Sequence, residues 1–144
     1  MSQRVTTTMN RIQWAATLAR RATLLCLVVM FIGTHIPSDA VHTFHYSDKW
    51  IHFLAYATLT FGILASWELS TGPLQPVHYF VVWLGATLYG AIDELTQIPV
   101  GRTCDGLDWL CDVLGIIVGL TLFRCLRPLL YRFLLRNSGS RPLS

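Results

Sequence analysis

Three groups of polar residues interrupt an otherwise apolar chain of 144 residues, and their side chains are of the kinds that transfer protons and bind cations. The groups are Asp48, Lys49, His52 and Tyr56; Asp93, Glu94 and Gln97; and Asp105, Asp108 and Asp112. A single arginine, Arg102, lies between the second and the third group. Within each group, polar residues are spaced three or four positions apart, and this spacing places their side chains on one face of a helix. Carboxylates beside a histidine are typical of general acid–base catalysis and also suit the binding of a polar ligand.

The elements that position these groups are predicted to be membrane helices. The chain is 53% hydrophobic and only 13% charged, which is about half the charge of an average soluble domain. A helix needs about 20 apolar residues to cross a bilayer. Apolar runs of roughly this kind cover about residues 22–36, 50–69, 78–98 and 106–123. The composition therefore excludes a disordered chain and predicts an all-α integral membrane protein, a four-helix bundle.

The distribution of basic residues predicts the orientation of this bundle. Of the 11 Lys and Arg residues, all but Lys49 and Arg102 lie before the first apolar run or after the last one. Because basic residues stay on the cytoplasmic side, both termini are predicted to be inside. The predicted parts are a basic cytoplasmic segment (residues 1–21), a membrane domain (22–131) and a basic cytoplasmic tail (124–144). We expect the tail to contact anionic lipid and expect no nucleic-acid partner.

The first apolar run also fits a secretory signal peptide. Its core at residues 22–33 follows two arginines and precedes Ser38, Asp39 and Ala40, a small-x-small cleavage pattern. Cleavage would leave three helices and would place the new N-terminus outside, without relocating any of the three polar groups. This alternative stays open at the level of the sequence.

Helix geometry places the three polar groups at one level. A rise of about 1.5 Å per residue and alternating helix directions put all of them in the outer half of the bilayer. Gly115 and Gly119 continue the face of the aspartates and predict close packing of that face on a neighbouring helix. So many carboxylates repel one another, and we expect Arg102 to organise them through a bidentate contact. Its expected partners are Asp93, Glu94 or Asp105.

The order and spacing of these residues resemble the VanZ-like family of small bacterial integral membrane proteins. The resemblance covers about residues 30–123 and rests on Asp48-Lys49-x-x-His52-Phe53-x-x-Tyr56, Asp93-Glu94-x-x-Gln97 and Arg102-x-x-Asp105-x-x-Asp108-x-x-x-Asp112-x-x-Gly115. In that family the residue matching Asp112 is commonly Asn, so this chain adds a carboxyl group. The resemblance implies a multi-pass protein of the bacterial inner (cytoplasmic) membrane. The name-giving members of the family are linked to teicoplanin resistance.

The function expected from the residues and the resemblance is recognition of a cell-envelope ligand by an outer-facing cavity that contains the carboxylates and Arg102. Expected partners are membrane lipids and either a cell-wall precursor or a glycopeptide. One alternative is an acid–base or metal-assisted hydrolase or transferase, in which Asp108 or Glu94 acts as the base and His52 as the acid. A second alternative is a proton-coupled carrier that uses the same carboxylates. The sequence leaves open whether the protein is an enzyme and in which oligomeric state it acts.

A purely structural role is the remaining interpretation, since small membrane bundles use buried polar networks to hold helices in register. The number of carboxylates favours a site, because packing does not need so many charges of one sign. The other histidines, with Asp39, match no metal-ligand spacing; they are His35, His42 and His45. We therefore predict no metal site and no cofactor from the sequence.

Overall fold

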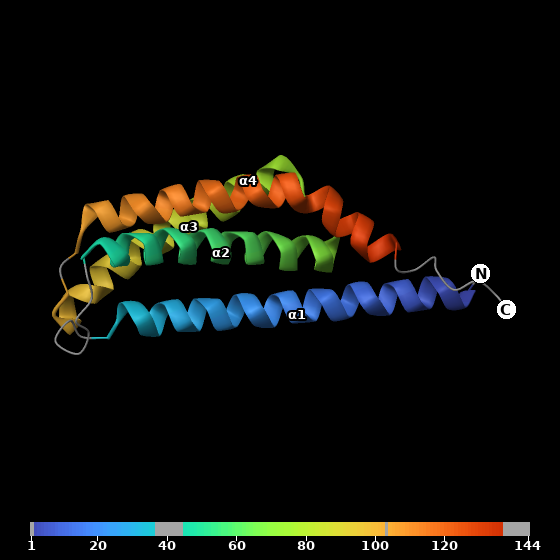
Figure 1. The fold of residues 1–144 in the computed structure, drawn as a ribbon, viewed down its shortest axis with the longest axis horizontal. Helices are drawn as coiled ribbons and strands as arrows, with labels where there is room; N and C mark the ends of the chain where they lie inside the picture. The colour runs from blue at the N-terminus through green and yellow to red at the C-terminus, as the bar shows by residue number, and fades with distance from the viewer. Residues whose placement is uncertain (1, 37–44, 103, 137–144) are drawn as a thin grey trace.

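The computed structural model describes residues 2–36, 45–102 and 104–136, and these ranges are helical with short connections. The elements are α1 (Ser2–Thr34), α2 (His45–Thr71), α3 (Pro76–Gln97), the short 3₁₀ helix η2 (Ile98–Val100) and α4 (Gly106–Arg136). The long helices lie side by side as a bundle (Figure 1). The predicted all-α fold is thereby confirmed.

Within the described residues, three helices are long and apolar enough to cross a membrane, over Met9–Thr34, Lys49–Thr71 and Gly106–Arg132. Helix α3 is not among them, so the prediction of four spans is met for three helices. The mean hydropathy of α3 is lowered by Asp93, Glu94 and several tyrosine, tryptophan and glycine residues. The start of α1 and the end of α4 lie at the same end of the bundle (Figure 1). The side of the membrane on which they lie stays a prediction.

Three helices are longer than predicted, α1 and α4 by the most and α2 (His45–Thr71) by a few residues at each end. Helix α1 begins at Ser2 rather than near residue 22, and α4 ends at Arg136 rather than near residue 123. Hydropathy detects only the apolar part of a helix, whereas its backbone hydrogen bonds continue through polar residues. Helix α4 also passes through Pro128, which lacks a backbone N–H, and its last part is inclined to the rest (Figure 1). The signal-peptide cleavage pattern at residues 38–40 lies outside the described residues.

Helices α2 and α4 pack backbone to backbone. A Cβ atom at Gly115 would overlap the carbonyl oxygen of Phe53, and one at Gly119 would overlap that of Ala57. The close packing predicted from this glycine pair is confirmed, and its partner is α2. The contact also sets the face of α4 that carries Asp108 and Asp112 against the face of α2 that carries His52.

The buried core of the bundle consists of two clusters of side chains. One consists of Tyr56, Ala86 and Ile116, and the other of Leu64, Ala65, Leu74, Val82 and Phe123. Helix α1 contributes little, since Ala16 is the one buried side chain among those of α1 that the structure describes. Its large apolar side chains, such as Leu25 (64% exposed) and Val29 (59% exposed), are placed to contact lipid.

The connection from α3 to α4 brings the polar groups of the two helices together. Gly101 has φ 78°, in the left-handed region that glycine adopts without a steric penalty, and it ends η2. The chain then returns over the end of α3, where the backbone N–H of Asp105 donates to Glu94 Oε2 at 3.1 Å. We call this end of the bundle, with the start of α2, the end of α3 and the start of α4, the polar end.

Candidate functional site

The residues of α2 at the polar end differ in burial. His52 and Tyr56 are buried, with 4% and 1% of their surface exposed, whereas Lys49 is half-buried at the rim. One helical turn separates each of these residues from the next, so they lie on one face. Asp48 belongs to α2, but its side chain lies outside the described part of the structure.

The residues at the end of α3 form a hydrogen-bonded network with α1. Gln97 Nε2 donates to Asp93 Oδ2 at 3.2 Å and to Glu94 Oε1 at 3.4 Å. Thr34 Oγ1 of α1 donates to Asp93 Oδ1 at 3.2 Å. Both Asp93 oxygens are therefore occupied by neutral donors. These hydrogen bonds join the end of α3 to the end of α1.

Asp105 has a local role at the start of α4. Its Oδ1 accepts a hydrogen bond from the backbone N–H of Leu107 at 2.9 Å, as in a helix N-cap. Asp108 and Asp112 follow on α4 and are buried, with 9% and 0% of their surface exposed. The three aspartates thus differ in position, because only Asp108 and Asp112 enter the interior of the bundle, whereas Asp105 precedes α4.

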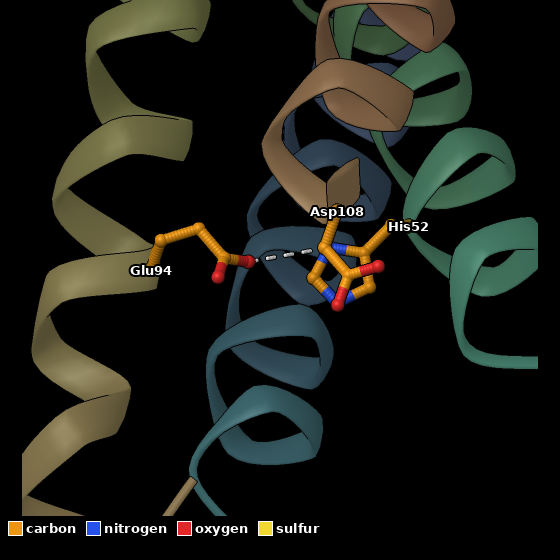
Figure 2. Close-up of side chains that lie close together, drawn as sticks. All are labelled: His52, Glu94 and Asp108. Carbon is orange, nitrogen blue, oxygen red and sulfur yellow. Dashed lines mark ion pairs between the residues drawn. The ribbon is translucent and has the colours of Figure 1, made fainter. Parts of the chain in front are cut away.

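His52 lies between carboxylates from two other helices. Its Nδ1 is 2.9 Å from Asp112 Oδ1 of α4 and 3.9 Å from Glu94 Oε1 of α3. Asp108 reaches the same place, and Figure 2 shows the side chains of His52, Glu94 and Asp108 approaching from three helices. One ligand-capable atom from each of these three residues lies within 4.8 Å of the other two.

The cation that pairs with the α4 aspartates is Lys49 rather than Arg102. Lys49 Nζ lies 2.9 Å from Asp105 Oδ2 and 2.7 Å from Asp108 Oδ1. The hydrogen bond from the Lys49 ammonium holds the pKa of the Asp105 carboxyl below its usual value, and the Leu107 N–H contributes in the same direction.

The expectation for Arg102 is corrected by these contacts. Its Nη1 donates to the carbonyl oxygen of Gly33 on α1 at 3.4 Å. Within residues 2–36, 45–102 and 104–136, no ion pair joins Arg102 to any of its expected partners. Those expected partners were Asp93, Glu94 and Asp105. The guanidinium, which follows the turn at Gly101, therefore contacts α1.

Two buried oxygen atoms at the polar end have no hydrogen-bond partner among the described residues. They are Asp112 Oδ2 and the Tyr56 hydroxyl. Both lie beside Gly90, where a Cβ atom would come within 3.2 Å of the carboxylate oxygen and 3.4 Å of the hydroxyl. The absence of a Cβ atom at Gly90 lets these two polar atoms pack close to the backbone of α3. Buried polar atoms of this kind usually bind water or a ligand.

A cavity of about 310 Å³ adjoins this cluster, between α1 and α2. Most of its wall is apolar and includes Val29, Met30, Ile51 and Ala55. The polar residues in the wall include His52, Tyr56 and Arg102. His52 therefore belongs both to the cavity wall and to the carboxylate cluster, so a molecule in the cavity would meet the one imidazole that the carboxylates surround.

Analysis of the sequence missed Thr34 and Glu68, and it considered His35 as a metal ligand without its contact to α3. Thr34 contacts Asp93, and His35 Nε2 lies 3.1 Å from Thr96 Oγ1, so the end of α1 joins the network of α3. Glu68 was also missed: it is 1% exposed and lies at the opposite end of α2. Its Oε1 accepts from Arg127 Nε at 2.6 Å. The signal available for Glu68 was its position inside an apolar run. His42, Asp39 and the His45 side chain lie outside the described residues.

Comparison with known proteins assigns the family. No curated protein and no solved structure matches the chain. A family model described as VanZ/LLP1 matches residues 5–128, which include α2, α3, most of α1 and α4, and the whole polar end. The chain therefore belongs to the VanZ family, as its polar motifs and apolar helices predicted.

Proposed function

We propose that this VanZ family member lies in the bacterial cytoplasmic membrane and binds an amphipathic cell-envelope molecule in the cavity between α1 and α2. The observation that carries the proposal is the composition of the cavity wall, which is apolar except for a few polar residues, among them His52, Tyr56 and Arg102. A hydrocarbon chain fits the apolar part. A guanidinium at one edge suits a phosphate or carboxylate head group. A lipid-linked cell-wall precursor has this combination of parts.

Binding to two matched lipids tests the proposal. The full chain in nanodiscs is titrated with a polyprenyl phosphate and with the uncharged polyprenol of the same length. We expect a preference for the phosphate, a loss of about tenfold of that preference in Arg102→Ala, and weaker binding of both lipids in Ala55→Phe, which fills the cavity. Arg132→Ala removes an exposed arginine of α4 and is the matched control. Equal binding of the two lipids by the wild-type chain, or unchanged binding by Ala55→Phe, would contradict the proposal.

We also propose a role in glycopeptide resistance, which the link of the family's name-giving members to teicoplanin resistance supports. If the cavity holds a cell-envelope ligand, expression of the chain in a teicoplanin-sensitive bacterium raises the inhibitory concentration of teicoplanin. The cavity-filling variant Ala55→Phe is expected to abolish the increase while Arg132→Ala retains it. An increase that survives the loss of the cavity would separate resistance from ligand binding.

The orientation of the bundle has its own test. Reporter fusions in the turn at residues 70–77 and at the C-terminus are expected to behave as cytoplasmic, and those in residues 40–46 as external. The distribution of the basic residues is the physical reason. A cytoplasmic signal from residues 40–46 would place the polar end on the inner side of the membrane.

A hydrolase or transferase is the second candidate, and one specific contact favours it. Asp112 Oδ1 lies 2.9 Å from His52 Nδ1, and His52 also faces the cavity. A carboxylate that orients an imidazole toward a bound substrate is a general acid–base arrangement, typically worth a factor of about 10² to 10⁴ in rate.

Conservative variants separate this enzyme from a binding protein. The assay follows phosphate release from a polyprenyl diphosphate by the purified chain. Catalysis predicts a loss of at least about 100-fold in His52→Gln, in Asp108→Asn or in Glu94→Gln, with folding retained by circular dichroism. Activity that survives in all three variants would contradict the enzyme hypothesis. Retention of the resistance phenotype in the two carboxylate variants would also contradict the proton-coupled carrier.

A further inference from the structure

Folding alone brings three ligand-capable side chains together at the polar end. His52, Glu94 and Asp108 come from α2, α3 and α4, and one ligand atom of each lies within 4.8 Å of the others (Figure 2). A metal ion with ligands at about 2.0–2.2 Å holds neighbouring ligand atoms roughly 3–4 Å apart. Side-chain rotations that move each atom by about 1 Å would therefore close the group around an ion. No metal-ligand spacing in the sequence marks this group, because its residues are far apart in the chain, although helix geometry predicts that they lie at one level.

The donor set selects a class of metal ion. One imidazole nitrogen and two carboxylate oxygens suit divalent ions that accept both nitrogen and oxygen ligands, and they disfavour ions that prefer sulfur. We propose that His52, Glu94 and Asp108 form a binding site for a divalent transition-metal ion, with Zn²⁺ and Mn²⁺ as the ions to test. The proposal does not rest on lipid binding in the cavity and stands or fails by itself.

A second observation supports a bound ligand here. Asp112 is completely buried, and its carboxylate is aimed into the group, since Oδ1 is 2.9 Å from His52 Nδ1. Its other oxygen, Oδ2, has no hydrogen-bond partner among the described residues, and the same holds for the nearby Tyr56 hydroxyl. A carboxylate that fixes a histidine ring is common beside metal ligands. Unpartnered buried oxygens next to it are suited to water molecules bound to the ion.

The charges at the polar end also support a bound metal ion. Four carboxyl groups are buried there, from Asp93, Glu94, Asp108 and Asp112. Among the ion pairs of the described residues, Lys49 and His52 are the basic groups that face these carboxyls. A divalent cation would remove the remaining excess of negative charge, which burial otherwise makes unfavourable.

Lys49 competes with the metal ion for Asp108. Its Nζ lies 2.7 Å from Asp108 Oδ1 and 2.9 Å from Asp105 Oδ2. When Asp108 binds an ion, Asp105 is still available as a partner for the ammonium. The positive charge of Lys49 nevertheless weakens the site, because like charges repel at this distance. Replacing Lys49 by a neutral residue of similar length therefore strengthens metal binding, whereas it leaves a purely structural network short of a cation.

The experiment measures metal binding to the full chain in nanodiscs after treatment with a chelator. Isothermal titration with Zn²⁺ and with Mn²⁺ is expected to show one ion per chain for at least one of the two metals. Glu94→Gln and Asp108→Asn are each expected to lower the affinity at least 100-fold. Lys49→Met is expected to raise it about tenfold. Glu68→Gln, which changes a buried carboxylate at the opposite end of the bundle, is the matched control and is expected to change the affinity less than threefold.

Two results would overturn the proposal. One is the absence of stoichiometric binding of either ion by the wild-type chain. The other is an affinity for the ion that does not rise in Lys49→Met, a variant that removes no ligand and so decides the question even if a ligand variant does not fold. Because these measurements use metal alone, their failure is distinguishable from a failure of lipid binding, which is read from the two polyprenyl lipids.

Discussion

The two ends of the bundle bury carboxylates in different ways. Glu68 is 1% exposed and is fully matched: Oε1 accepts from Arg127 Nε at 2.6 Å, and Oε2 accepts from the backbone N–H of Leu74 at 3.2 Å. At the polar end, four buried carboxyl groups share Lys49, His52 and a few neutral donors. One of their oxygens, Asp112 Oδ2, has no partner among the described residues.

The difference shows which property separates a structural charge from a candidate site. Burial does not separate the two kinds of carboxylate, because Glu68 is as deeply buried as Asp112. The balance of charge separates them. The Glu68 carboxylate has one guanidinium and one N–H as partners, so its charge and both of its oxygens are satisfied within the chain. An excess of carboxylates is complete only when a proton, a metal ion or a ligand is added. Glu68 therefore belongs to the fold, and the polar end is where binding is expected.

The largest expected effect is the loss of the matched pair. Glu68→Ala leaves Arg127 without its carboxylate and leaves the Leu74 N–H unpaired, so the free energy of unfolding is expected to fall by about 3–5 kcal/mol. Chemical denaturation in detergent micelles, followed by circular dichroism, measures it. The double change Glu68→Ala with Arg127→Met is expected to recover part of the loss. A loss below about 1 kcal/mol in the single variant would mean that the pair contributes little to the fold.

The same chemical change at the two ends sharpens the comparison. Glu68→Gln removes the charge opposite Arg127 and is expected to lower the free energy of unfolding by about 2 kcal/mol, the value of a hydrogen bond to a charged group. Asp112→Asn removes one of several repelling charges and keeps an acceptor for His52, so a change of less than about 1 kcal/mol is expected. Both variants are measured by the same denaturation experiment. Equal losses would show that the polar end is balanced after all.

Helix geometry explains which part of the site could be predicted. The rise per residue and the antiparallel order of the helices fix the level of each polar group, and the structure places His52, Glu94 and Asp108 together at that level. The backbone contact of α4 with α2 followed from the spacing of Gly115 and Gly119. These features depend on regular helices, for which sequence position determines place in space.

The pairing of charges could not be predicted in this way. Arg102 follows Gly101, whose φ of 78° reverses the chain, and sequence spacing carries no information about where such a turn directs a side chain. Glu68 was missed although it stands inside the predicted span at residues 50–69. Its partner Arg127 lay beyond the predicted end of the fourth helix at residue 123, whereas α4 continues to Arg136.

The smallest expected effect distinguishes the two cations of the polar end. Lys49 Nζ lies 2.7 Å from Asp108 Oδ1, so a double-mutant cycle of Lys49→Met and Asp108→Asn is expected to give a coupling free energy of about 1 kcal/mol, limited by the partly exposed position of the ammonium. The Arg102 guanidinium contacts the Gly33 carbonyl instead. A cycle of Arg102→Ala and Glu94→Gln is therefore expected to give less than about 0.5 kcal/mol. Both cycles use unfolding free energies of the full chain in the same detergent. A larger coupling for Arg102 than for Lys49 would restore Arg102 as the residue that organises the carboxylates.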